Sequence, residues 1–290
     1  MKRLLFILVA ILTIITANAT KRALFIAVGN YPSKSGWVKI NSRNDVDLLV
    51  PVFRNAGFKV TILLDGQATH SGISNALKAL ASQCQKGDQV FIHFSCHGQQ
   101  MVDVVGDESD GLTETMVPYD ARREPSKTYH GQNHFTDDQL NRHLNEIRKK
   151  LGKKGQLMVT LDACHSGDGT RGEEDDELND SIMGQQRGVS DIFCPNPPYN
   201  KRVVYRGHAL NKPKGKGYSS MIALSACQPD QVSHEFKDRR TGKSYGPLSY
   251  LIWLELKGNK TINFKQLADG IIKNKNYAMK RYQQPYLIIE

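Results

Sequence analysis

The chain has 290 residues, of which 39% are hydrophobic and 23% are charged. These values are typical of a soluble globular protein that is long enough to bury a sizeable core. The formal charge is +10, from 39 basic and 29 acidic residues. A basic surface can attract nucleic acid, but the chain lacks the basic motifs interleaved with aromatic residues that such modules carry, so we expect no nucleic-acid partner.

The N-terminus has the parts of a secretory signal. Basic residues at 2–3 precede an apolar run at 4–15, and Ala-Asn-Ala at 17–19 matches the small-residue pattern that a signal peptidase reads. The run is short for a membrane-spanning helix, so cleavage is favoured over an uncleaved anchor. We expect residues 1–19 to be a signal peptide. The mature chain then begins at about Thr20, is exported to the periplasm or beyond the cell, and has no stable membrane insertion.

In the first half of the chain, apolar runs alternate with helical patterns, which predicts a parallel sheet with crossover helices. Ile73, Leu77 and Leu80 illustrate the helical spacing, because side chains three or four positions apart share one face of a helix. The expected strands are 22–28, 59–64 and 89–95, and the expected helices are 44–55 and 69–85.

The second half continues this alternation around two irregular stretches. Residues 99–135 show no clear period, and residues 168–218 read as a long loop, which in a compact domain is usually functional. Between them, Thr136 can cap a helix while Gln139 bonds back to it. Without a repeat or a second domain, residues 20–290 are expected to form one α/β domain. The remaining expected elements are strands at 156–162, 221–225 and 285–289 and helices at 247–257 and 261–274.

Polar residues follow two of the expected strands where each strand ends. His97-Gly98 comes after the strand at 89–95, and Cys164 lies in the Asp-Ala-Cys-His-Ser-Gly run at 162–167. Active sites of open parallel sheets form beyond the carboxyl ends of the strands, so His97 and Cys164 would face each other if these strands are neighbours. The imidazole can take the thiol proton, and the backbone amides of Gly98 and Cys164 can hold the developing oxyanion.

Two other interpretations of these residues compete with catalysis. A single cysteine or histidine at a strand end is usually a buried or hydrogen-bonded structural residue. A zinc site is the other interpretation, but the spacing of the ligands matches no common zinc motif, and a strand sends His93 and Cys96 to opposite faces. We therefore expect no metal there. The ligands of such a site would be His93, Cys96, His97 and His165.

The chain has five cysteines, an odd number for an exported protein. At least one of them stays unpaired within the chain, which indicates a free and possibly reactive thiol. A chain of this length does not need disulfides to fold. The sequence leaves open whether Cys84, Cys194 and Cys227 include a disulfide pair.

Several motifs occur in a fixed order over residues 91–167. They are Phe91-Ile-His-Phe-Ser-Cys-His-Gly-Gln, Gly106-Asp-Glu-Ser-Asp-Gly, Val117-Pro-Tyr-Asp, Thr136-Asp-Asp and Leu161-Asp-Ala-Cys-His-Ser-Gly. The series resembles the metacaspases, which are caspase-like cysteine peptidases, and weaker similarities extend it over nearly the whole mature chain. The resemblance implies a caspase-haemoglobinase fold, a three-layer α/β/α sandwich with a mostly parallel central sheet, and a His97–Cys164 catalytic dyad.

The resemblance also implies cleavage after arginine or lysine through an acidic pocket. The two acidic positions of that pocket match Asp45 and Asp162, and a pocket serine matches Ser95. A position that holds cysteine in some members holds Ser42 here. Two carboxylates in a pocket favour a guanidinium or ammonium group and repel the aspartate that true caspases prefer. The structural alternatives are a strand-end cap for Asp162 and a helix N-terminus for Asp45.

The calcium site of many metacaspases is only partly matched. Asp137 and Asp138 match two of its four carboxylate positions, whereas the other two hold Thr113 and Arg171. Half of the hard oxygen ligands are lost, and an arginine opposes a cation. We therefore expect no required cofactor and no strict calcium dependence, and we interpret residues 106–111 as a solvated turn.

The stretch at 168–218 falls where caspase relatives are cut into a large and a small piece. A pocket that accepts basic side chains could cut its own chain there, which makes this region a possible processing site. The candidate residues are Arg171, Arg187, Lys201, Arg202, Arg206 and the lysines between 212 and 216.

The predicted function is that of an exported, monomeric cysteine endopeptidase that cuts peptide or protein substrates after arginine or lysine. One alternative keeps the fold and the dyad but has another specificity, or acts as an amidase or transpeptidase on envelope peptides. Another alternative is a catalytically silent caspase-like binding domain. It is disfavoured, because such a relative would have little reason to keep both His97 and Cys164.

Overall fold

The computed structural model describes residues 19–103, 106, 111–163, 183–189, 191–195, 217–228, 231, 233–279 and 283–290. Nearly all of the predicted signal peptide and most of the predicted loop at 168–218 lie outside these ranges, and so does Cys164. Within the described ranges, no helix combines the length and the apolar character that crossing a membrane requires.

A six-stranded sheet forms the centre of the protein, in the order β12-β9-β7-β3-β1-β2. Neighbouring strands run parallel except for the edge pair β9–β12, which is antiparallel. The prediction of a mostly parallel sheet is confirmed, and each expected strand matches an observed one to within one residue at either end. The strands are β1 (Lys21–Ala27), β2 (Lys59–Leu64), β3 (Gln89–Ser95), β7 (Gln156–Asp162), β9 (Ser220–Ser225) and β12 (Tyr286–Ile289).

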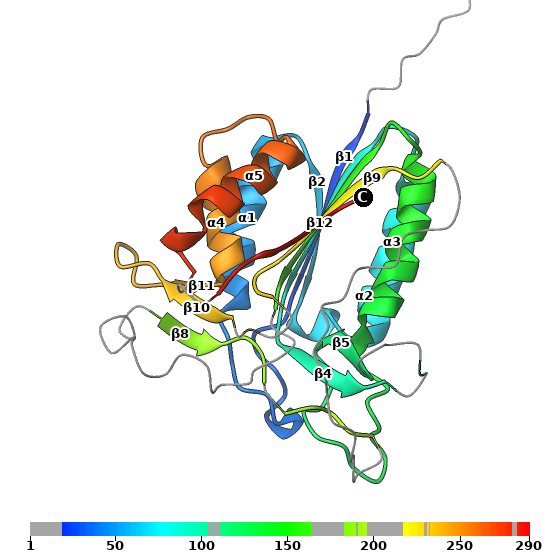
Figure 1. Ribbon diagram of the computed structural model, residues 1–290, viewed down its shortest axis with the longest axis vertical. Coiled ribbons are helices and arrows are strands. Elements are labelled where there is room, and N and C mark those ends of the chain that lie inside the picture. The colour runs from blue at the N-terminus through cyan, green and yellow to red at the C-terminus, as the bar shows by residue number, and fades with distance from the viewer. Residues whose placement is uncertain are drawn as a thin grey trace, which may run out of the picture.

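Helices cover both faces of this sheet, which gives the predicted α/β/α sandwich (Figure 1). Thr136 caps α3 as expected: its hydroxyl accepts a hydrogen bond from the Gln139 amide, and the Gln139 side chain accepts one from the Thr136 amide. One face carries α1 (Ser42–Asn55), α4 (Pro247–Leu256) and α5 (Phe264–Asn274), and the other carries α2 (His70–Gln83) and α3 (Asp137–Leu151).

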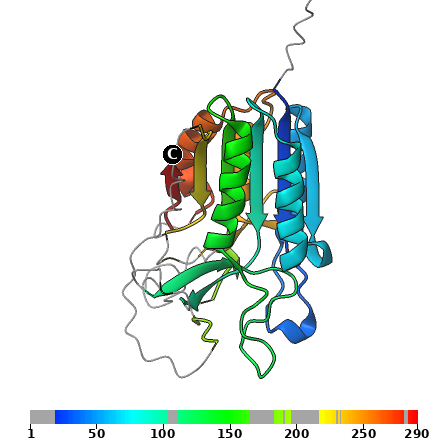
Figure 2. The ribbon, with the colours of Figure 1, turned by 90° about the vertical axis from the view of Figure 1, so that its right-hand side faces the viewer.

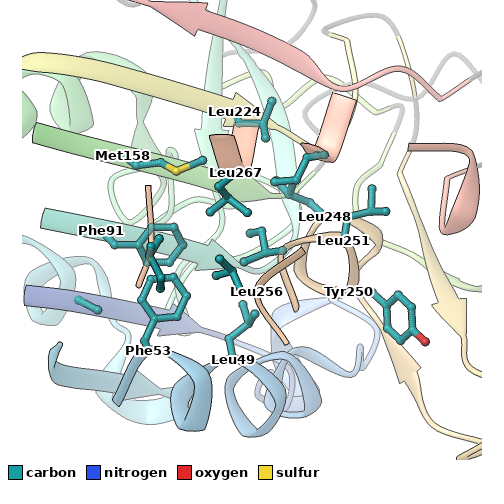
Figure 3. Close-up of a cluster of buried hydrophobic side chains, with 14 of the residues drawn as sticks. Leu49, Phe53, Phe91, Met158, Leu224, Leu248, Tyr250, Leu251, Leu256 and Leu267 are labelled. Atoms are coloured by element: carbon teal, nitrogen blue, oxygen red, sulfur yellow. The ribbon is translucent and has the colours of Figure 1, made fainter. Parts of the chain in front are cut away.

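The alternation of side chains along the central strands divides the core into two clusters. In β1, Phe25 belongs to the cluster beneath α1, α4 and α5, whereas Leu24 and Ile26 belong to the cluster beneath α2 and α3. Figure 3 shows the first cluster, where Phe53 of α1 stacks on Phe91 of β3 with 4.2 Å between ring centroids. The two faces of the sheet are therefore buried against separate helix layers.

Two three-stranded sheets lie beyond the carboxyl ends of the central strands (Figures 1 and 2). The expectation that residues 99–135 and 168–218 lack regular structure is wrong at residues 99–102, 112–116, 135 and 183–186, which belong to these strands. Short polar strands carry no apolar alternation, and their stability comes from partners distant in the chain, so a local pattern does not reveal them. One sheet contains β4 (Gly98–Val102), β5 (Leu112–Met116) and β6 (Phe135–Thr136), and the other contains β8 (Met183–Gln186), β10 (His234–Lys237) and β11 (Ser244–Tyr245).

Phe53 offers a test of this core. It is fully buried and its ring contacts those of Phe25, Phe58 and Phe91. Phe53→Ala is expected to lower the free energy of unfolding by about 3–5 kcal/mol, measured by urea denaturation, because the lost contacts leave a cavity. Tyr277→Ala is the matched control, since Tyr277 is 56% exposed, and it is expected to cost less than about 1 kcal/mol. Equal losses for both variants would contradict the core assignment.

Candidate active site

Strands β3 and β7 bring two polar segments to one edge of the central sheet. The strands are direct neighbours, and Ser95 pairs with Asp162 in their register. His97 stands two positions after Ser95 in the sequence, and Cys164 stands two positions after Asp162, although Cys164 itself lies outside the described residues. The condition on which the dyad prediction depends, that the two strands are adjacent, is therefore met.

The His97 imidazole is fully buried and is held by several groups. Its Nε2 lies 2.9 Å from the Val38 carbonyl oxygen, and because a carbonyl only accepts hydrogen bonds, Nε2 carries the proton. The Trp37 ring stacks on the imidazole at 5.0 Å, and the Tyr31 hydroxyl accepts a hydrogen bond from the His97 amide at 3.1 Å. Nδ1 is buried without a hydrogen-bond partner among the described residues, so its lone pair is available.

Burial lowers the pKa of His97 to about 4, and the positive charge of Arg187 acts in the same direction. The hydrogen bond to the Val38 carbonyl opposes this shift without reversing it. The ring is therefore neutral at pH 7, and Nδ1 can accept a proton. A ring with so low a pKa also releases a bound proton readily. A group that protonates a leaving amine needs this property.

The loop between β1 and α1 carries the residues that hold His97, and Asp65 fastens this loop. The Asp65 carboxylate accepts hydrogen bonds from the Gly29 amide at 2.9 Å, the Asn30 amide at 2.9 Å and the Asn30 side chain at 3.0 Å. Asp65 has φ +46°, a left-handed conformation that is uncommon for a residue with a Cβ. Its bonds to the loop offset that strain, so Asp65 acts on His97 as a positioning residue.

A fully buried guanidinium, that of Arg187, lies among carboxylates at the same edge. Its nitrogens are 2.8 Å from Asp45, 3.1 Å from Glu235 and 3.9 Å from Asp162. It also donates a hydrogen bond of 2.8 Å to the Ser95 hydroxyl, which in turn donates to Asp45 at 2.7 Å. The structure thus brings together the predicted pocket residues Asp45, Ser95 and Asp162, around an arginine of the chain itself.

Ser42 and Gly98, the other described residues of the predicted site, differ in their contacts. Ser42 begins α1, and its buried hydroxyl has no hydrogen-bond partner among the described residues, so it does not bind the guanidinium. Gly98 begins β4, and its amide donates to the carbonyl oxygen of Arg187 at 3.2 Å. The predicted oxyanion donor is therefore bonded to a peptide carbonyl.

Glu235 and Ser249 belong to the site although the sequence analysis missed them. The Glu235 carboxylate, in β10, accepts from the Asn41 amide at 2.5 Å and the Asn41 side chain at 2.6 Å. The amide and hydroxyl of Ser249, in α4, donate to Asp162 at 2.7 and 2.6 Å. Neither residue stands at a predicted strand end or in a family motif, so no local signal marked them.

His93 supports this pocket from within the core. Its Nδ1 lies 2.7 Å from the Thr160 hydroxyl and its Nε2 lies 3.1 Å from the Ser249 hydroxyl. Burial lowers the pKa of His93 to about 3, so the ring is neutral. Hydroxyl groups engage both nitrogens and leave neither for a metal. Across the described ranges, no group of three or more His, Cys, Asp or Glu side chains is arranged to hold a metal ion.

The pocket holds more acidic groups than its one cation neutralises. Burial raises the pKa of Asp45 to about 6 against the opposing effect of Arg187, and burial raises the pKa of Asp162 as well. Burial lowers the pKa of Arg187, but the facing carboxylates more than offset this and leave it above its ordinary value. Such a cluster is suited to hold one basic side chain.

The four cysteines that the structure describes, Cys84, Cys96, Cys194 and Cys227, are all free, so none of them pairs with another of this set. Burial raises the pKa of Cys84 to about 11 and the pKa of Cys96 to about 12. At neutral pH these two thiols carry almost no thiolate and are poor nucleophiles.

Known proteins resemble this chain over 70% to 93% of its length. Metacaspase-1A of Aspergillus oryzae is 30% identical over 304 residues, which covers 93% of this chain and 68% of that protein. Metacaspase-1 of Mycosarcoma maydis is 24% identical over 301 residues, covering 92% and 69%. Metacaspase-1 of Schizosaccharomyces pombe is 29% identical over 231 residues, covering 70% of this chain and 50% of that protein. The chain spans about half to two thirds of the length of these relatives.

A solved structure and a family model match the chain as well. A crystal structure of a protein from Geobacter sulfurreducens matches with a TM-score of 0.62 at 20% identity, covering 93% of each chain, and at this identity the likeness shows the fold alone. The family model described as the caspase domain matches residues 20–281. The chain therefore belongs to the caspase-domain family, within which it is similar to the metacaspases.

Proposed function

We propose that the chain is a cysteine endopeptidase that cleaves peptide or protein substrates after arginine or lysine. The observation that carries this proposal is the buried pocket in which Asp45, Asp162 and Glu235 surround a guanidinium. A pocket that already satisfies one guanidinium has the charge and the hydrogen-bond acceptors for a basic side chain of a substrate. The same carboxylates would repel an aspartate.

In the proposed reaction, Nδ1 of His97 accepts the thiol proton of Cys164, and the sulfur attacks the carbonyl carbon that follows the basic side chain. The Gly98 amide, together with that of Cys164, donates to the oxyanion. As the C–N bond breaks, His97 returns the proton to the leaving amine. Water then attacks the thioester with His97 again as base, which releases the carboxylate and restores the thiol.

We propose further that this activity needs no calcium. Asp137 and Asp138 lie in the first turn of α3, and the Asp137 carboxylate accepts a hydrogen bond from the Asp138 amide at 2.9 Å. Carboxylates stabilise a helix N-terminus in any protein, so a structural role accounts for both residues without a metal ion.

The proposed specificity is tested with fluorogenic peptides that end in arginine, lysine or aspartate. Wild type is expected to cleave the arginine and lysine peptides only, with or without a chelator. Cys164→Ala and His97→Ala are expected to lower kcat/KM by about 10³-fold or more, because each removes a group that takes part in the reaction. Cleavage after aspartate would reject the specificity, and a requirement for calcium would reject the proposed independence. No cleavage, with slow alkylation of Cys164 by iodoacetamide, would favour the silent binding domain.

The titration of Asp45 predicts how this activity depends on pH. A protonated carboxyl does not attract a guanidinium, and Asp45 has a pKa of about 6, whereas His97 has a pKa of about 4. As pH rises through about 6, Asp45 ionises and kcat/KM for arginine peptides is expected to rise, mainly through a lower KM. Asp45→Asn is expected to remove this rise with pH and to lower kcat/KM about 10- to 150-fold, which corresponds to about 1.5–3 kcal/mol of transition-state binding. Asp269→Asn, on the exposed side of α5, is the control. A rise of kcat/KM near pH 6 that persists in Asp45→Asn would contradict the attribution of this titration to Asp45.

We also propose that residues 1–19 direct export and that the mature protein is a monomer. The Cys164→Ala variant, expressed from the full sequence, is expected to leave the cytoplasm as a chain that begins at about Thr20, because a signal peptidase cuts after a small-x-small pattern. Intact-mass measurement and light scattering check the start and the monomer. A chain that keeps residues 1–19 in the membrane fraction would contradict the cleavage.

A further inference from the structure

The amino ends of the parallel strands share one edge of the central sheet, opposite the edge that carries the candidate active site (Figure 2). Four connections between elements lie at this edge. Hydrogen bonds join neighbouring connections: the Gly87 amide donates to the Leu151 carbonyl oxygen at 2.9 Å, and the Gln89 side chain donates to the Ile262 carbonyl oxygen at 3.1 Å. We call this surface the basic edge, and its segments are 54–59, 83–89, 149–156 and 257–265.

The exposed charge of these four segments is entirely positive. Asp88 is the only acidic residue among them, and its carboxylate is buried 3.5 Å from the Arg22 guanidinium. The nearby Glu290 carboxylate is buried against Arg148. The basic edge therefore presents ten exposed cations, as many as the formal net charge of the whole chain. They are Arg54, Lys59, Lys86, Lys149, Lys150, Lys153, Lys154, Lys257, Lys260 and Lys265.

The composition of the basic edge suits a lipid surface better than a nucleic acid. Proteins that bind single-stranded nucleic acid stack its bases on aromatic side chains, but Phe58 and Phe264, the aromatic residues of the four segments, are buried. Lysine predominates among the cations, and its ammonium group pairs with phosphate as a point charge without a fixed geometry. Cations spread over four segments match an anionic bilayer, which presents phosphate groups over a wide area.

The apolar run of the N-terminus brings this same edge to a bilayer. Thr20 lies at the basic edge, because its amide donates to the Asp88 carboxylate at 2.7 Å. The apolar run ends at residue 15, and residues 16–19 can span at most about 15 Å. While the proposed signal peptide is in the membrane, the chain therefore keeps the basic edge close to the lipid headgroups.

From this charge and this position we infer that the basic edge is a docking surface for a bilayer of anionic phospholipid, on which the mature protein stays after residues 1–19 are removed. The contact is peripheral, since ammonium groups meet headgroup phosphates and no segment enters the hydrocarbon. His97 follows the opposite end of β3, whose seven residues span about 23 Å, so the candidate active site faces the water. This docking surface is independent of the proposed peptidase function.

Vesicle sedimentation tests the docking surface. The Cys164→Ala protein, in its exported form, is mixed with vesicles of phosphatidylcholine alone or of phosphatidylcholine with phosphatidylglycerol. At about 0.1 M salt the affinity for the anionic vesicles is expected to be about 10²-fold higher or more, because each lysine near an anionic surface contributes about fivefold. At about 1 M salt the protein is expected to dissociate, because the screening length falls to about 3 Å.

Two variants that lose the same charge locate the contact. The test variant lacks four lysines of the basic edge and is expected to bind the anionic vesicles about 10²-fold more weakly or less. The control variant lacks four lysines beyond the carboxyl ends of the strands and is expected to stay within about twofold of the parent. All eight side chains are exposed, so both variants are expected to keep the parent's urea midpoint. The test substitutions are Lys149→Gln, Lys150→Gln, Lys153→Gln and Lys154→Gln, and the control substitutions are Lys34→Gln, Lys127→Gln, Lys237→Gln and Lys243→Gln.

Lysine acetylation, read by mass spectrometry, reports the orientation on the vesicle. Anionic vesicles are expected to protect Lys153 and Lys260 and to leave Lys34 and Lys127 reactive. Equal affinity for both kinds of vesicle, no binding to either, equal losses in the two variants or equal protection of the two edges would overturn the inference. Tighter binding to double-stranded DNA than to the anionic vesicles, at the same salt, would also overturn it and would assign the basic edge to nucleic acid.

Discussion

The buried guanidinium of Arg187 is the charge around which the site is assembled. Removing a lone charge from water costs more than any single contact stabilises, so Arg187 is tolerated in the interior only because carboxylates face it. These carboxylates come from separate parts of the fold: Asp45 from α1, Asp162 from β7 and Glu235 from β10. The docking of the β8–β10–β11 sheet beside the central sheet is therefore coupled to the formation of the pocket.

Polar groups around the carboxylates complete the pocket and set its shape. Ser95 and Ser249 donate to the aspartates, and the Gly246 amide donates to Asp45 at 2.8 Å. A Cβ on Gly246 would lie 2.1 Å from an Asp162 carboxylate oxygen and 2.7 Å from the Arg187 guanidinium, so only glycine permits the backbone to pass there. The pocket therefore has the shape and the oxygen acceptors to bind a planar cation such as a guanidinium.

The imidazole depends on a different set of contacts, although His97 stands only two positions from Ser95. The loop after β1 supplies the Val38 carbonyl and the stacked Trp37 ring, and Asp65 fastens that loop from the end of β2. Because the Val38 carbonyl accepts a hydrogen bond from Nε2, Nε2 carries the proton, and Nδ1 is the nitrogen that can act as a base. The end of β3 connects the two sets of contacts, because Ser95 contributes to the pocket and His97 would perform the proposed proton transfer.

The sequence by itself determined the central sheet, its helices and the capping box of α3, because periodicity and capping are local properties of the chain. A polar motif at a strand end also identified His97 as a candidate, and the resemblance to metacaspases identified Asp45, Ser95 and Asp162. The sequence placed Ser95 and His97 at the end of one strand and Asp162 at the end of another, whereas the structure showed that these two strands are neighbours.

Only the tertiary structure decided which other groups meet at that edge. Glu235 lies in a short strand with no pattern of its own, and its partner Asn41 is 194 positions away in the chain. Arg187 appears in the sequence as one basic residue among several, and nothing local shows that it fills the pocket or that the Gly98 amide bonds to its carbonyl. These contacts arise from the pairing of β8 with β10 and of Phe193 with β4, which depends on segments that are brought together only by folding.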